Sequence, residues 1–180
     1  MRTIFLTGFM GSGKTTIGTM LGEKLWIPAY DMDQLIVQKA GKSINEIFDD
    51  DGESIFRQLE SDVLKSLPLE NALVMTGGGI ILDEGNRKWM KENGLTVYLQ
   101  CSIDQIKKRL ENDETRPLIN GSKKKDIEII FLSRKELYEE AELTVDVTAL
   151  EPSVIVDLLI ERLKSLNNTH NIMGDYNENE

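Results

Sequence analysis

Five runs of apolar residues along the chain predict buried β-strands. They span residues 3–8, 27–33, 72–79, 95–100 and 143–148. These runs are nearly continuously apolar rather than alternating with polar positions, which is typical of parallel strands covered on both faces. The pattern therefore predicts a five-stranded parallel sheet.

Helices are predicted between these strands and after the last one. They span residues 14–25, 34–40, 44–49, 53–66, 83–92, 102–111, 125–140 and 152–165. Asp83 and Ser102 are suitable caps for two of the starts, and Pro152 suits a first turn. The alternation of strands and helices predicts an α/β fold, a three-layer doubly wound sandwich.

Two segments depart from this alternation. Between the second and third strands, a stretch at about 33–62 has no strand, and we interpret it as a substrate-binding insertion. Residues 112–124 are polar, include Pro117 and Gly121, and are long enough for a mobile lid. We expect one domain at 1–165 and a polar, disordered tail at 166–180.

Charge and composition exclude several functions. The net charge of -10 over 180 residues argues against binding nucleic acid or an anionic membrane. Cys101 is the one cysteine, so no disulfide framework forms, and no apolar run approaches a membrane span or a signal peptide. The one histidine, His170, lies in the expected tail, which argues against a histidine base. We expect a cytoplasmic monomer.

The segment Gly8–Thr15 fits the pattern G-x-x-x-x-G-K-[ST], between a predicted strand and a predicted helix. Its glycines allow successive N–H groups to form a concave anion site, at which the helix points its positive end. Lys14 can then reach the β- and γ-phosphates, and the Thr15 hydroxyl can ligate Mg²⁺. The motif predicts a nucleoside triphosphate site of the P-loop type.

Two aspartates end the second predicted strand, at the sheet edge where such folds bind ligands. In an extended chain, Asp31 and Asp33 would point to one side and face the phosphates. One could hold Mg²⁺ through water, and the other could accept a proton from an attacking hydroxyl. The alternative is that Asp33 is only a helix cap. GTPases are excluded because no N-K-x-D occurs, and D-x-x-G at 49–52 follows a helical run.

The other candidate residues suit a small anionic acceptor. Thr76-Gly77-Gly78-Gly79 ends the third strand and lets a ligand approach backbone N–H groups. Arginine is suited to bidentate capture of carboxylate or phosphate. Three arginines lie in informative places, one each in the insertion, the lid and the helix at 125–140: Arg57, Arg116 and Arg134.

These motifs together resemble the shikimate kinase family. The resemblance covers about residues 1–165 and rests on G-x-x-G-S-G-K-T-T, the Asp31/Asp33 pair, GESIFRQLE, TGGG, RPLI and R-x-x-x-Y in this order. It implies phosphorylation of the 3-hydroxyl of shikimate by ATP. Two alternatives remain: another P-loop small-molecule kinase, such as one for gluconate or a nucleoside monophosphate, and a nucleotide-binding regulator without catalysis.

The resemblance also implies residue roles. Asp31 would assist Mg²⁺ through water, and Asp33 would bind shikimate hydroxyls and act as the base. Glu60 would orient Arg57. The family's polar adenine contact is replaced here by Leu150-Glu151-Pro152-Ser153, so we expect backbone contacts at Pro152. The implied ATP-binding residues are Gly11, Ser12, Gly13, Lys14, Thr15, Thr16, Arg116 and Pro152. The implied substrate-binding residues are Asp33, Arg57, Gly78, Gly79 and Arg134. Lys14, Asp33 and Arg116 would be catalytic.

Overall fold

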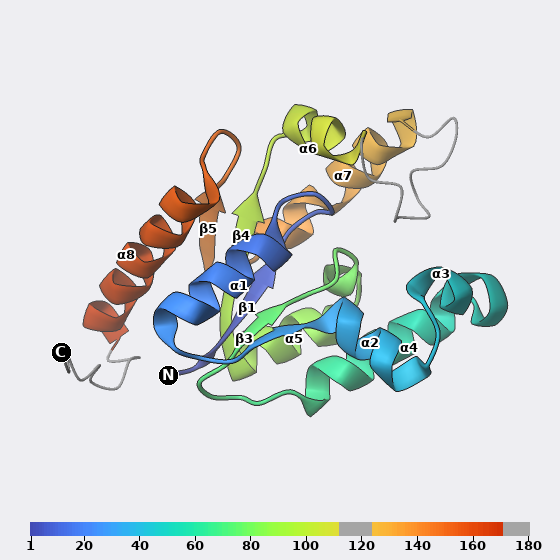
Figure 1. The fold of residues 1–180 in the computed structure, drawn as a ribbon, viewed down its shortest axis with the longest axis horizontal. Helices are drawn as coiled ribbons and strands as arrows, with labels where there is room; N and C mark the ends of the chain where they lie inside the picture. Colours follow the sequence, from blue (N-terminus) through green and yellow to red (C-terminus); the bar gives the residue numbers. More distant parts are fainter. Residues whose placement is uncertain (112–123, 171–180) are drawn as a thin grey trace.

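The computed structural model describes residues 1–111 and 124–170 (Figure 1). Its five strands are β1 (Thr3–Thr7), β2 (Ala29–Asp31), β3 (Leu73–Met75), β4 (Gly94–Gln100) and β5 (Leu143–Asp146). They lie in the order β2-β3-β1-β4-β5, and every neighbouring pair is parallel. The predicted five-stranded parallel sheet, with helices on both faces, is therefore confirmed.

The helices agree with the predicted positions to within two residues, apart from two larger differences. They are α1 (Lys14–Leu25), α2 (Met32–Ala40), α3 (Ile44–Glu46), α4 (Glu53–Ser66), α5 (Glu84–Asn93), α6 (Ile103–Leu110), α7 (Lys124–Glu139) and α8 (Pro152–His170), with a π-helical turn, η1 (Ile47–Asp51), and a 3₁₀ turn, η2 (Ile80–Leu82). The cap predictions hold, because the side chain of Asp83 accepts from Asn86 N–H at 2.8 Å and that of Ser102 accepts from Gln105 N–H at 3.4 Å.

The first difference is at 44–49, predicted as one regular helix. A capping box between Ser43 and Glu46 starts α3. The helix then continues as the wider π-helical turn η1, which is capped at Gly52 with a φ of 86°. Hydrophobic spacing does not separate an α-turn from a π-turn, so the sequence could not show this change.

The second difference is the length of α8, which ends at His170 rather than at 165. Adding turns to a helix that has already formed costs little, so polar residues can continue it. Residues 166–170 of the expected tail are therefore helical, and 171–180 lie outside the described residues. The 19 residues of α8 place the backbone of His170 about 27 Å from the start of the helix, which lines the cavity described below.

One face of the sheet is covered by α1 and α8, which pack side by side. Two glycines allow α1 to lie close to the strands. A Cβ on Gly18 would lie 2.4 Å from Met75 Cγ, and one on Gly22 would lie 2.9 Å from Ala29 Cβ. Close packing fixes the start of α1 directly above the carboxyl end of the sheet.

The opposite face is covered by α5 and α7. The ring of Phe5 on β1 meets Trp89 of α5 edge-on, with centroids 5.8 Å apart. Tyr98 on β4 stacks on Tyr138 of α7, with centroids 5.1 Å apart. Cys101 is 1% exposed and packs as a small core residue.

The chain between β2 and β3 is helical, as α2, α3, η1 and α4, and contains no strand (Figure 1). The predicted lid at 112–124, with Arg116, lies outside the described residues except for Lys124, the first residue of α7. Within residues 1–111 and 124–170, none of the helices has the length and apolar character needed to cross a bilayer.

Candidate active site

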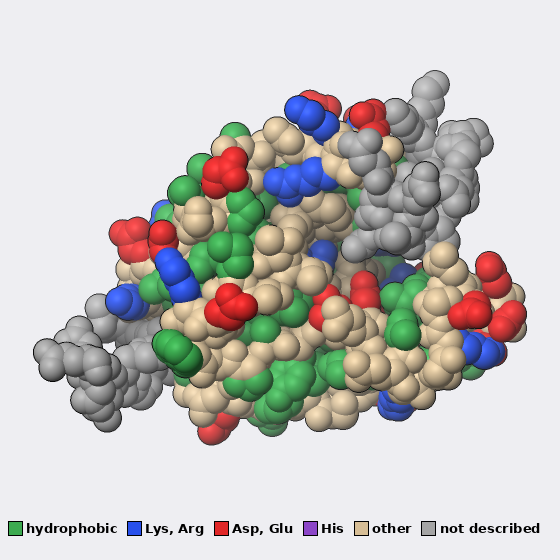
Figure 2. All heavy atoms as spheres, in the orientation of Figure 1, with side chains coloured by type: hydrophobic (Ala, Val, Ile, Leu, Met, Phe, Trp, Pro, Cys, Tyr) green, Lys and Arg blue, Asp and Glu red, His purple; other side chains and the backbone are tan. Residues whose placement is uncertain are grey.

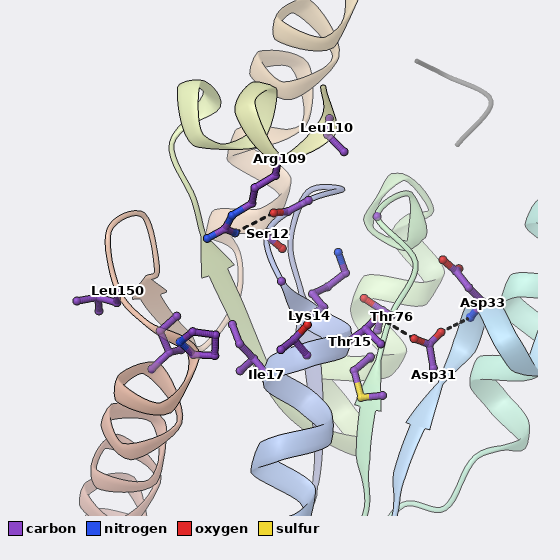
Figure 3. Close-up of a pocket in the computed structure, with 17 residues that line it drawn as sticks. Ser12, Lys14, Thr15, Ile17, Asp31, Asp33, Thr76, Arg109, Leu110 and Leu150 are labelled. Carbon is purple, nitrogen blue, oxygen red and sulfur yellow. Dashed lines mark hydrogen bonds between the residues drawn. The ribbon is translucent and has the colours of Figure 1, made fainter. Parts of the chain in front are cut away.

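A cavity of about 390 Å³ opens at the carboxyl ends of β1, β2 and β3 (Figure 3). Figure 2 shows the hollow in this face, with acidic and basic side chains at its edge. Its lining comes from the loop after β1, the β2–α2 junction, the turn after β3, and the ends of α6 and α8. The lining residues are Gly11, Ser12, Gly13, Lys14, Thr15, Thr16, Ile17, Asp31, Asp33, Met75, Thr76, Gly78, Arg109, Leu110, Leu150, Pro152 and Ile155. This is the edge where parallel α/β sheets bind ligands.

The loop after β1 has the backbone that its glycines predict. Gly11 and Gly13 have φ values of 77° and 98°, a region that favours glycine. Gly13 precedes α1 and has no side chain, so no capping side chain accepts from the first N–H groups of that helix. The ammonium of Lys14 donates to the carbonyls of Gly8 at 2.7 Å and Phe9 at 3.1 Å. The loop therefore presents N–H groups and a cation at one anion site.

Asp31, not Asp33, caps α2. Its Oδ1 accepts from the N–H of Asp33 at 3.0 Å and of Gln34 at 3.4 Å. The alternative reading of Asp33 as the cap is therefore wrong. The argument from an extended chain is wrong as well, because the backbone turns into α2 at Met32. Both carboxylates nevertheless line the cavity, since the first turn of α2 faces it.

The second carboxylate oxygen of Asp31 meets the P-loop. Its Oδ2 accepts from Thr15 Oγ1 at 2.9 Å (Figure 3). A hydroxyl and a carboxylate oxygen beside a phosphate site are the donors that Mg²⁺ takes in nucleotide-binding proteins, where it keeps several waters. These two residues fit a nucleotide-bound Mg²⁺.

Arg57 on α4 is held by two glutamates. Its Nη1 donates to Glu60 Oε2 at 2.7 Å, and its Nη2 donates to Glu53 Oε1 at 3.0 Å. The guanidinium lies against Gly79, because a Cβ there would be 2.3 Å from Arg57 Nη1. Burial works to lower the pKa of Arg57, but the two carboxylates raise it on balance. The arginine is thus a fixed cation beside the turn formed by Gly77, Gly78 and Gly79, which we call the glycine turn.

Glu60 is a buried carboxylate, only 1% exposed. Burial raises its pKa, and this outweighs the opposing effect of Arg57. A Cβ on Gly77 would lie 2.5 Å from Glu60 Oε1 and 3.2 Å from Asp33 Oδ1, so both carboxyl groups approach Gly77. Because Gly77 has no side chain, the carboxyl groups of Glu60 and Asp33 can both lie next to it.

Arg134 reaches the same turn from α7, with its Nη1 3.5 Å from the carbonyl oxygen of Gly78. The structure therefore brings Arg57 and Arg134 to one glycine turn from helices far apart in the sequence. Most candidate residues within the described ranges line the cavity, whereas four lie around the glycine turn next to it: Arg57, Glu60, Gly79 and Arg134. Arg116 is the one candidate outside the described ranges.

Arg109 is a site residue that the sequence did not reveal. It extends from α6 over the P-loop, and its Nη1 donates to the Gly11 carbonyl at 2.9 Å (Figure 3). Pro152 of α8 also lines the cavity. In the sequence, Arg109 follows Lys107 and Lys108 and resembles an exposed, basic helix end. The one feature of the sequence that could have indicated a role at the site was its position just before the predicted lid.

Comparisons with known proteins agree on one family. A sequence-family model described as shikimate kinase matches residues 10–164. A shikimate kinase of Bacillus cereus (strain AH187) is 47% identical over 166 residues, which cover 91% of this chain and 99% of the relative. The chain belongs to the shikimate kinase family. The resemblance found in the sequence is therefore confirmed, and the protein is an ATP-dependent kinase.

Solved structures separate this family from the nearest alternative. A shikimate kinase from Acinetobacter baumannii in complex with shikimate has a TM-score of 0.88 and 31% identity, covering 92% of this chain and 94% of that one. A gluconokinase from Sinorhizobium meliloti has a TM-score of 0.59 and 18% identity, covering 93% and 94%. The second likeness shows the fold alone, so a gluconate kinase is not favoured.

Arg109→Ala should weaken ATP binding and leave shikimate binding unchanged, because the guanidinium lies over the P-loop and away from the glycine turn. We expect the KM for ATP to rise about three- to tenfold, the usual effect of one hydrogen bond with a cationic donor. Arg162→Ala on the exposed side of α8 is the matched control. A rise in the shikimate KM alone would contradict the assignment.

Gly79→Ala should weaken shikimate binding. Its Cβ would lie 2.6 Å from Arg57 Cζ, so the guanidinium has to move from the turn. Because a flexible side chain can yield, we expect a small change in melting temperature but a shikimate KM raised about tenfold or more. Gly85→Ala, at the start of α5, introduces the same methyl group outside the site. Equal kinetics in both variants would show that Arg57 does not act at the turn.

Proposed function

We propose that this protein transfers the γ-phosphoryl group of ATP to the 3-hydroxyl of shikimate, with Mg²⁺, and so forms shikimate 3-phosphate for aromatic amino-acid biosynthesis. Membership of the shikimate kinase family along nearly the whole chain is the observation that supports this most strongly. The cavity adds support, since its two ends carry different chemistry. The phosphate loop lines one end, and Asp33 and Gly78 line the other, where two arginines lie beside the glycine turn.

The P-loop end is proposed to hold ATP. The N–H groups of residues 11–16 and the Lys14 ammonium bind the phosphates, and the charge of Lys14 stabilises the transferring group. Adenine lies between Arg109 and Pro152, which both line the cavity. Thr15 and, through water, Asp31 would hold Mg²⁺, which would neutralise phosphate charge when bound. From residues 112–124, Arg116 is proposed to close onto the phosphates.

The glycine-turn end is proposed to hold shikimate. Arg57 and Arg134 clamp the carboxylate, because two fixed guanidinium groups suit one small anion. The N–H groups of Gly78 and Gly79 add donors. Asp33 binds the hydroxyls and takes the proton from the 3-hydroxyl as its oxygen attacks the γ-phosphorus, and ADP leaves. Glu60 orients Arg57 through the 2.7 Å ion pair.

One assay tests the proposal against its alternatives. ADP release should be measured with shikimate, gluconate and AMP as acceptors at equal protein concentration, with and without Mg²⁺. We expect turnover with shikimate alone and only in the presence of Mg²⁺, and phosphorus NMR should place the new phosphate on the 3-oxygen. Faster turnover with gluconate or AMP, or none with any acceptor, would refute it.

We also propose that the enzyme works as a monomer in the cytoplasm. The support is its acidic charge and its single buried cysteine, which suits a reducing compartment. Size-exclusion chromatography with light scattering checks the first part, and a mass near twice the 20.4 kDa of one chain would refute it.

A further inference from the structure

Tyr138 is a buried tyrosine on α7, one helical turn after Arg134. It is 1% exposed. Its ring stacks on that of Tyr98, with an angle of 10° between the planes. Its hydroxyl donates to the carbonyl oxygen of Gly78 at 2.5 Å. Burial raises the pKa of Tyr138, so its hydroxyl keeps its proton and remains a donor at neutral pH.

The Gly78 carbonyl controls a neighbouring N–H group. In a trans peptide, the C=O of one residue and the N–H of the next point in opposite directions, and the described residues contain no cis peptide. Holding the Gly78 oxygen towards α7 therefore turns the Gly79 N–H away from that helix. Among the described residues, the N–H groups of Gly78 and Gly79 have no hydrogen-bond acceptor. Gly78 lines the cavity, and Gly79 is buried against the Arg57 guanidinium, so a carboxylate bound to that arginine would lie beside both N–H groups.

Two backbone hydrogen bonds flank this peptide: Ile80 N–H donates to the Gly77 carbonyl at 3.3 Å, and Leu82 N–H donates to the Gly79 carbonyl at 3.0 Å. Neither of them holds the Gly78 oxygen itself. Gly77, Gly78 and Gly79 carry no side chains, and glycine peptides reorient at low cost. Arg134 also approaches the Gly78 oxygen, but at 3.5 Å, which is the limit of a hydrogen bond. Among the described residues, the Tyr138 hydroxyl therefore makes the shortest hydrogen bond to the Gly78 oxygen.

We propose that Tyr138 is a positioning residue that orients the Gly78–Gly79 peptide for the substrate carboxylate. The inference rests on the proposed function, since that function supplies the carboxylate. Tyr138 does not touch the substrate. It acts through the glycine turn. Its loss should therefore affect binding at the glycine-turn end of the cavity and not at the P-loop end.

Tyr98→Phe is a matched control for Tyr138→Phe. Both rings are buried in one stack, but the Tyr98 hydroxyl is buried without a hydrogen-bond partner among the described residues. We expect Tyr138→Phe to raise the shikimate KM about three- to tenfold, the effect of one lost hydrogen bond, with the ATP KM unchanged. Tyr98→Phe should change neither. Equal effects of both variants, or no effect of Tyr138→Phe, would overturn the proposal.

Ligand truncation separates positioning from general loosening. Binding should be compared for shikimate and for its analogue with a hydroxymethyl group in place of the carboxylate. We expect Tyr138→Phe to weaken binding of shikimate only. Equal weakening for both ligands would overturn the proposal. If the wild-type enzyme phosphorylates no shikimate, the proposed function itself is wrong. That result is distinct from a failure of the Tyr138 proposal, which would appear only in the comparison of the two ligands.

A third variant guards against a folding defect. Tyr138→4-aminophenylalanine restores an N–H donor at the same ring position. We expect it to recover most of the shikimate affinity lost in Tyr138→Phe. Should Tyr138→Phe not fold, this variant decides alone: near wild-type affinity supports the proposal, and a folded enzyme with the shikimate KM raised tenfold overturns it.

Discussion

Lys14→Met should lower kcat about 10²–10³-fold while the protein keeps its fold, because one electrostatic donor to the reacting group is lost. In the structure, the Lys14 ammonium lies at the mouth of the P-loop on the carbonyls of Gly8 and Phe9. Methionine keeps most of the length of the side chain and removes the charge. The loss should appear in kcat more than in the KM for ATP, since negative charge on the transferring group develops during the reaction.

Lys24→Met on the same helix is the control. Lys24 is half exposed and pairs with Asp157 of α8 at 2.5 Å, far along α1 from the loop. An exposed pair of this kind contributes less than about 1 kcal/mol, so the control should keep near wild-type kcat. Steady-state kinetics and thermal melting of the three proteins make the comparison. A Lys14→Met enzyme within about tenfold of wild-type kcat would contradict the role of Lys14.

The P-loop could be predicted from sequence because its residues act locally. Glycines at 11 and 13 need no distant partner to adopt positive φ, and the lysine and threonine follow directly. The caps at Asp83 and Ser102 are local in the same sense. The order of strands and helices follows from buried runs and their spacing.

Geometry that depends on distant partners could not be predicted. Asp31 caps α2 because the strand ends there and the helix begins at Met32. The residue at which a strand ends and a helix begins is the feature that sequence patterns predict least well. Arg109 became a site residue because α6 crosses the P-loop, which the residues around it do not encode. The family motif indicated Arg57 and Glu60, but not that Glu60 is buried with its carboxyl close to that of Asp33.

Arg57→Ala should damage shikimate binding and stability together. Loss of the clamp costs about 2–5 kcal/mol of binding free energy for shikimate, with ATP affinity close to normal. The same change leaves Glu60 buried without its hydrogen-bonded cation, although the more weakly acting Arg134 remains. Breaking a buried pair in this way costs about 3–5 kcal/mol of stability. Glu53 also loses a partner, but it is 60% exposed and should matter little.

The stability loss should depend on pH in a defined direction. Burial raises the pKa of Glu60 in the folded protein above its ordinary value of 4.5. The stability that its protonated form contributes is complete below about pH 4.5 and is lost as pH rises through the folded pKa. Without Arg57 that pKa rises further, so the loss continues to higher pH. The gap in melting temperature between wild type and Arg57→Ala should therefore be larger at pH 8 than at pH 5.

The double variant Arg57→Ala/Glu60→Gln separates the two effects. The amide removes the buried charge, so most of the lost stability should return and the pH dependence of the gap should disappear. Shikimate binding should stay weak, because the carboxylate clamp is still missing. Melting temperatures at both pH values and titration with shikimate make the test. If the double variant regained shikimate affinity, Arg57 would serve only to neutralise Glu60, and its assignment to the substrate carboxylate would be wrong.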